Sequence, residues 1–105
     1  MLLVHALLAA AAETVTLGAD AWSVTSPAAT LTAHQPVRRL VWALEADGGA
    51  VLVIRHAGGE ADSANAAALR AALVALGIPS TRLRLEPVAA APRSLILELS
   101  ATNTR

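Results

Sequence analysis

The segment from Ala50 to Pro87 most strongly limits the folds that this chain can adopt. It begins with a run of apolar, mostly β-branched residues, passes through a Gly-Gly loop, and then carries apolar residues at helical spacing as far as a Gly-Ile-Pro sequence. The next stretch, Arg82–Glu86, alternates charged and apolar residues, as a strand with one buried face does. This order predicts a strand, a helix and a parallel strand, which together form a βαβ crossover. The loop after the first strand of such a unit is where α/β folds usually bind ligands.

The remaining patterns complete the predicted order of elements. Glu13–Leu17 alternates polar and apolar residues and predicts a short first strand. Pro36 can open a helix at its first position, and apolar residues recur three and four positions apart as far as Leu44. Leucines alternate over Leu95–Leu99 and predict a last strand. The order β-α-β-α-β-β predicts a two-layer α/β (α+β) sandwich, a mixed sheet with both helices on one face.

The same patterns predict how individual side chains are placed. Asp62 or Ser63 can cap the second helix, because a side-chain oxygen there can accept a hydrogen bond from an N–H of the first turn. In the following strand, Leu83 and Leu85 are expected to face the core and the charged residues, Arg82 included, to face solvent. The apolar side of the second helix is expected to comprise Ala66, Leu69, Ala72, Leu73 and Leu76.

Composition argues against several classes of function. The formal net charge is +0, so the chain offers no basic footprint for nucleic acid or anionic membranes. Cysteine is absent, which excludes disulfides and thiolate catalysis. The aromatic residues are Trp22, expected to pack at a sheet edge, and Trp42, expected to be half-buried, and two are too few for a stacking platform. The histidines are scattered, so no metal site and no cofactor are expected.

Residues 1–12, MLLVHALLAAAA, form an apolar run that only His5 interrupts. The run is shorter than the ~20 residues that span a bilayer, and three alanines before Glu13 fit the cleavage rule of secretory signal peptides. A basic start is missing, and a buried N-terminal helix is the alternative. We expect a signal peptide over 1–12, one domain over 13–100 and a polar tail over 101–105. The mature protein would then be periplasmic, with no membrane span.

Residues 36–87 resemble the OmpA-like domain, the peptidoglycan-binding module at the C-terminus of OmpA and MotB proteins. The resemblance implies an OmpA-like fold. In that family the second helix carries Arg-Ala, an apolar pair and Gly-Ile-Pro before the next strand, and the central strand ends in an apolar residue, Gly and His. The corresponding residues here are Asn65-Ala66, Leu69, Leu73, Gly77-Ile78-Pro79-Ser80 and Ile54-Arg55-His56.

The resemblance also implies where a ligand would bind. The family holds diaminopimelate with an Asp shortly after the central strand and an Arg in the second helix. In this chain the Asp position falls at Ala57 or Gly58, and the Arg position falls at Asn65. Asn lacks the charged, forked donor that binds a carboxylate through two hydrogen bonds. We therefore expect the scaffold to have lost the usual peptidoglycan-binding pair.

The polar residues of the βαβ unit gather between its first strand and its helix. Glycines there let backbone N–H groups approach a ligand, and the N-terminus of the helix favours anions. A structural interpretation is the alternative: the glycines make the turn, and the acidic residues cap the helix and favour its dipole. The candidate binding residues are Arg55, His56, Gly58, Gly59, Glu60, Asp62, Asn65 and Arg70.

The run from Val51 to Ala57 also resembles the strand-Arg-His opening of the histidine phosphatases. That family needs a second His and further Arg residues after the motif, and no His follows His56. The function we expect is a non-enzymatic, exported binding or assembly module of the cell envelope, without catalytic residues. Its partner would be a cell-envelope protein or a cell-wall component. The alternatives are a small hydrolase that uses His56 with Glu60 or Asp62, and a structural accessory protein without a ligand.

Overall fold

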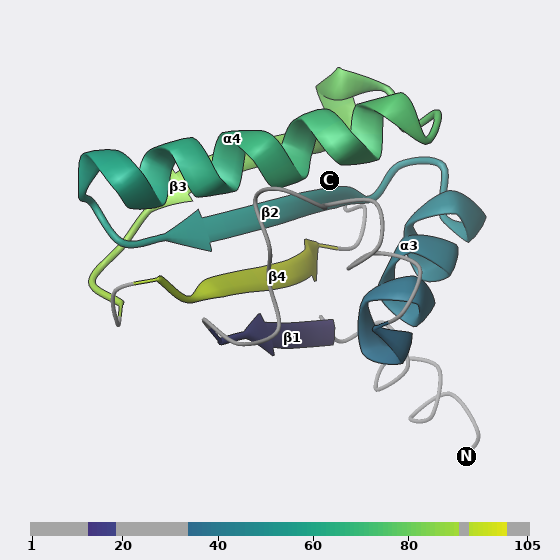
Figure 1. Cartoon of the computed structure of the whole chain (residues 1–105). Coiled ribbons are helices and arrows are strands. Elements are labelled where there is room, and N and C mark those ends of the chain that lie inside the picture. Colours follow the sequence, from purple (N-terminus) through teal and green to yellow (C-terminus); the bar gives the residue numbers. More distant parts are fainter. Residues whose placement is uncertain (1–12, 19–33, 91–92, 101–105) are drawn as a thin grey trace, which may run out of the picture.

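The computed structural model describes residues 13–18, 34–90 and 93–100. The expected signal peptide, Trp22 and the expected polar tail lie outside these residues. The described elements, shown in Figure 1, are β1 (Glu13–Leu17), α3 (Gln35–Ala46), β2 (Val51–His56), α4 (Glu60–Ala75), the short 3-10 helix η1 (Ser80–Arg82), β3 (Leu83–Pro87) and β4 (Leu95–Ser100).

The strands form one four-stranded sheet in the order β1-β4-β2-β3. β2 and β3 are parallel, and β4 is antiparallel to both β1 and β2. The fold is therefore α+β, with a mixed sheet and two helices, as the sequence predicts. The last strand of the chain lies inside the sheet, between its first two strands (Figure 1).

One face of the sheet carries the hydrophobic core. Strand pairing aligns Leu52 with Leu99 and Leu83, and Ile54 with Leu97, so these side chains share a face. Both helices bury their apolar stripes in the same cluster of side chains, and they therefore lie on that one face: α4 packs over β2 and β3, and α3 over β1 and β4 (Figure 1). The helical residues of the cluster are Val37, Leu40, Leu44, Ala66, Leu69 and Leu73.

The end of α4 differs from the expected apolar face. Leu76 is 52% exposed, whereas Ile78 is buried. Gly77 has φ +109°, a conformation that glycine adopts without strain. Its N–H donates to the carbonyl of Val74, and the Ile78 N–H donates to that of Leu73; these two hydrogen bonds define a Schellman motif. The chain turns at Gly77, so Ile78 fills the core position expected for Leu76.

Other side-chain predictions were wrong for reasons of local geometry. Trp42 is 61% exposed because, at 100° per residue, it lies 200° around α3 from both Leu40 and Leu44, which face the core. Leu85 does face the core cluster, as expected, but it is only half-buried because β3 is an edge strand. Arg82 precedes β3 in the turn η1, so the strand alternation does not apply to it, and its guanidinium is half-buried.

Candidate functional site

Three strands have an end at the same end of the sheet. His56, the last residue of β2, pairs with Pro87 of the parallel strand β3 and with Leu95, the first residue of the antiparallel strand β4. The N–H of Val88, just after β3, donates to the His56 carbonyl at 2.8 Å. The loop after β2, the start of α4 and the segment before β4 are therefore brought to one end of the molecule.

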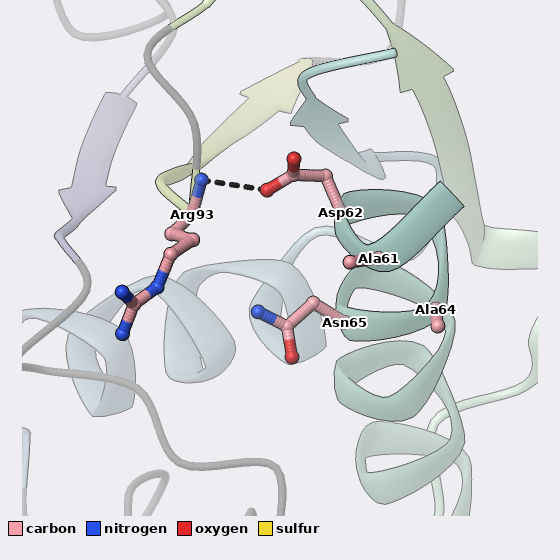
Figure 2. A pocket seen from close by; sticks show the side chains of 5 residues that line it. All are labelled: Ala61, Asp62, Ala64, Asn65 and Arg93. Carbon is pink, nitrogen blue, oxygen red and sulfur yellow. Dashed lines mark hydrogen bonds between the residues drawn. The ribbon is translucent and has the colours of Figure 1, made fainter. Parts of the chain in front are cut away.

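Asp62 ties the start of α4 to the segment before β4. Its side chain does not cap the helix: the N-cap residue is Gly59, without a side-chain cap hydrogen bond. Instead, Asp62 Oδ1 accepts a hydrogen bond of 2.6 Å from the backbone N–H of Arg93 (Figure 2). Arg93 has φ +66°, an uncommon conformation for a residue other than glycine. The buried carboxylate thus holds Arg93 in place, and the expected cap by Asp62 or Ser63 was wrong.

A hollow of about 320 Å³ lies beside this hydrogen bond, and its lining combines two alanines with three polar side chains. Figure 2 shows the Asn65 side chain reaching from α4 with its amide nitrogen toward the side on which the Arg93 side chain lies. The lining residues are Ala61, Asp62, Ala64, Asn65 and Arg93.

The polar groups of the hollow complement a small charged ligand. The Arg93 side chain is exposed, and no ion pair or side-chain hydrogen bond joins its guanidinium to a described residue. A guanidinium can bind a carboxylate or a phosphate through two parallel hydrogen bonds. The carboxamide of Asn65 can donate and accept, and the carboxylate of Asp62 accepts only. The lining therefore offers a guanidinium, a carboxamide and a carboxylate to a ligand.

Two of the expected site residues, Asp62 and Asn65, line the hollow. Gly58, Gly59 and Glu60 precede them in the chain, all three exposed. Gly59 accepts the first helical hydrogen bond through its carbonyl, and Glu60 opens α4. A negative charge in the first turn stabilises a helix, so Glu60 fits the structural interpretation of this loop.

His56 is buried, at 5% exposure, on the sheet face that carries the core. Its Nδ1 atom lies 2.8 Å from the carbonyl oxygen of Ala57, and since a carbonyl can only accept, Nδ1 is the donor. Among the described residues, neither Glu60 nor Asp62 forms a hydrogen bond or an ion pair with His56. A histidine that acts as a general base has to be within hydrogen-bond reach of its substrate or of a partner acid.

Arg55 lies on the opposite face of the sheet from His56, because neighbouring residues of a strand alternate. Its Nε donates to Glu86 Oε1 at 2.7 Å, and its Nη1 donates to Glu98. These two carboxylates, Glu98 first and then Glu86, raise the pKa of Arg55 above its usual value, because they favour the charged form. Arg55 is thus paired away from the hollow.

Arg70 is also engaged elsewhere. Its guanidinium donates to the carbonyl oxygens of Leu83 at 3.2 Å and Ser80 at 3.0 Å, which joins α4 to the start of β3. It lies five positions after Asn65, or 140° around the helix. Of the eight expected residues, Asp62 and Asn65 line the hollow, and the other six, Arg55, His56, Gly58, Gly59, Glu60 and Arg70, do not.

No sequence pattern pointed to Arg93. It follows a loop, belongs to no motif, and lies 31 positions from Asp62. The pairing of β4 with β2 would have revealed it: once Leu95 is placed opposite His56, Arg93 falls beside the loop after β2. That pairing joins residues far apart in the chain, and no local pattern encodes it.

The chain was compared with protein-family models, with curated proteins and with solved structures. It matches none of them. In the part of the chain that the structure describes, no helix is long and apolar enough to cross a membrane. Within the same residues, no cluster of His, Asp and Glu side chains has the makeup of a metal site.

Proposed function

We propose that this protein is a non-enzymatic binding or assembly module of the cell envelope, exported to the periplasm, with a degenerate OmpA-like fold. Three features support the proposal: the mixed sheet with two helices, the resemblance of residues 36–87 to OmpA-like domains, and the apolar run over residues 1–12. Its partner would be a cell-wall component or another envelope protein.

The hollow beside Asp62 is the observation that carries the binding function. It lies at the carboxyl end of β2, where open α/β sheets place their ligands. A buried carboxylate holds the neighbouring backbone through a hydrogen bond, so the lining is preorganised. Arg93 adds to this lining a guanidinium that has no partner among the described residues.

The hollow differs from the site that the family resemblance implies. Ala57 or Gly58 stands where the family has Asp, and Asn65 stands where it has Arg. Arg93 supplies the missing positive charge from another segment. A ligand bearing a carboxylate would thus bind between Arg93 and Asn65. The family's Asp still has no counterpart at Ala57 or Gly58. A hydrogen bond to a charged group contributes about 1.5–3 kcal/mol, so we propose weaker binding of diaminopimelate-containing peptides than by OmpA-like domains.

Weak, site-specific binding can be tested by amide NMR. The labelled full chain would be titrated with soluble muropeptides, and we expect saturable chemical-shift changes at residues 59–65 and at Arg93. Arg93→Gln removes the guanidinium and should abolish those changes. Arg84→Gln is the matched control, because Arg84 is exposed on the opposite face of the sheet, and it should leave them intact. Absence of shifts, or shifts that survive Arg93→Gln, would contradict the proposed site.

Turnover assays on the same protein preparation test the hydrolase alternative. We expect no turnover of phosphate esters or of muropeptides, because His56 is buried and its Nδ1 is held by Ala57. Turnover that His56→Ala abolishes, while Arg93→Gln preserves it, would replace the binding proposal with an enzymatic one.

A further inference from the structure

The polar side chains around the hollow beside Asp62 have hydrogen-bonding capacity to spare. The carboxamide of Asn65 and the guanidinium of Arg93 form no hydrogen bond and no ion pair with any residue that the structure describes. Asp62 uses only Oδ1 among the described residues, to accept from the backbone N–H of Arg93 at 2.6 Å. All three side chains therefore retain donors or acceptors for a ligand.

The two charges of the lining do not neutralise each other. No oxygen of Asp62 lies within 4.0 Å of a guanidinium nitrogen of Arg93. In Figure 2 the Arg93 side chain runs away from the carboxylate, toward the side to which the Asn65 amide points. The hollow thus has an acceptor at one end and charged and neutral donors at the other. It complements a ligand that carries an N–H donor at one end and an acid at the other.

Simpler ligands would use only part of this lining. A phosphate or sulfate ion presents acceptors alone and would bring its charge close to Asp62, which the N-terminus of α4 offsets only in part. A metal ion or a simple amine would suit Asp62 but would bring a positive charge close to Arg93. The last residue of a peptide combines both groups, because one carbon atom separates its amide N–H from its terminal carboxylate.

The apolar part of the lining limits the size of the ligand. Ala61 and Ala64, both exposed in the first turns of α4, contribute only methyl groups. The volume of about 320 Å³ is at the lower end of the range of small-molecule sites, about 300–1,000 Å³. The hollow therefore suits a short, narrow end of a chain better than a bulky side chain.

We propose that the hollow binds the free C-terminal end of a peptide whose last side chain is small. The terminal carboxylate lies between the Arg93 guanidinium and the Asn65 carboxamide, and the last peptide N–H donates to Asp62. The small side chain contacts Ala61 and Ala64. Capture of a terminal carboxylate is a recurring mode of peptide recognition. This inference rests on the binding function proposed above and specifies its ligand as a chain end.

Amide NMR of the labelled full chain with synthetic peptides tests this ligand class. N-acetyl-alanyl-alanine should cause saturable shifts at residues 61–65 and at Arg93. Its C-terminal amide lacks the charge, and N-acetyl-alanyl-lactate has an ester oxygen in place of the last N–H, so each should bind about tenfold or more weakly. The L and D forms of the last residue are separate arms, because protein termini carry L residues whereas cell-wall peptides end in D residues.

The exposed side of α4 allows a test of the small-side-chain contact that leaves the core intact. Ala64→Leu fills the hollow with a larger side chain and should abolish the peptide-induced shifts. Ala71→Leu is the matched control, because Ala71 is exposed two turns further along the same side of α4 and outside the lining. It should bind the peptide as the wild type does. Thermal melts check that both variants fold, and a folded Ala64→Leu variant that still binds would overturn the proposal.

The peptide series also separates this inference from the binding function on which it rests. If muropeptides cause shifts that Arg93→Gln abolishes, while the free acid and its amide bind equally, the binding function stands and the chain-end ligand is wrong. If free alanine binds more tightly than the acetylated dipeptide, the ligand is an amino acid and not a peptide end. If neither muropeptides nor peptides cause shifts, both proposals fail.

Discussion

Arg82 connects three segments that share no local sequence pattern. Its Nε donates to the carbonyl of Ala50 at 3.1 Å, and its Nη2 donates to the carbonyls of Leu44 and, in addition, Asp47. These carbonyls lie at the end of α3 and in the turn that follows, where helical carbonyls lack partners. A positive charge at the C-terminus of a helix also offsets the helix dipole. Arg82 therefore fixes the turn that leads into β2.

Replacing Arg82 tests this role. Arg82→Met keeps much of the apolar stem but removes the guanidinium from three carbonyls, of which that of Asp47 keeps the Ala50 N–H as a donor. We expect the free energy of unfolding to fall by about 1.5–3 kcal/mol. Arg84→Met is the matched control, two positions along the chain and exposed, with an expected change within about 0.5 kcal/mol. Urea titration followed by circular dichroism measures both. Equal effects for the two variants would refute the anchoring role.

The leucines of α4 offer a second comparison. Leu73 is fully buried, whereas Leu76, just before the turn at Gly77, is half-exposed. Leu73→Ala should lower the free energy of unfolding by about 2–5 kcal/mol, and Leu76→Ala by less than about 1 kcal/mol. Leu85→Ala should fall between them because Leu85 is only half-buried. The order of the three urea midpoints is the measurement. A reversed order would mean that the core-facing side of α4 is assigned wrongly.

The C-terminus of α4 depends on one backbone conformation. Gly77→Ala would introduce a Cβ at φ +109°, where L residues are strained, and should lower the free energy of unfolding by about 1–2 kcal/mol. Gly48→Ala is the control, because an added Cβ meets open space at both positions but Gly48 does not have a positive φ. Calorimetric melting of both variants gives the answer. An unchanged melting temperature for Gly77→Ala would mean that the turn relaxes freely.

The order of the elements was readable from the sequence because each has a local signature. Helical spacing marked α3, leucine alternation marked β4, and Gly-Ile-Pro marked the end of α4. The role of Arg82 was not readable in this way, because it depends on carbonyls more than thirty positions away. The exposure of Trp42 does follow from helical spacing, since Trp42 lies on the far side of α3 from Leu40 and Leu44. Asp62 was recognised as important, yet its partner Arg93 depends on strand pairing.

The proposal of an exported protein makes a prediction about the whole chain. Signal peptidase should cleave near Ala12, because the run before it is apolar, short and closed by small residues. Mass spectrometry of the protein from a periplasmic extract should then find Glu13 at or near the N-terminus. An intact Met1 in the cytoplasmic fraction would contradict both export and the periplasmic assignment.

The position of β4 between β1 and β2 has a consequence for how this chain acquires its structure. β1 pairs with no described strand except β4, so β1 has no described partner until β4 has been synthesised. Contacts of such long sequence separation form slowly, because the intervening loop must close first. The pairing of β1 is therefore a late step in folding. A version ending at Arg93 should accordingly show no cooperative unfolding transition, and a cooperative transition in that fragment would show that β4 is dispensable.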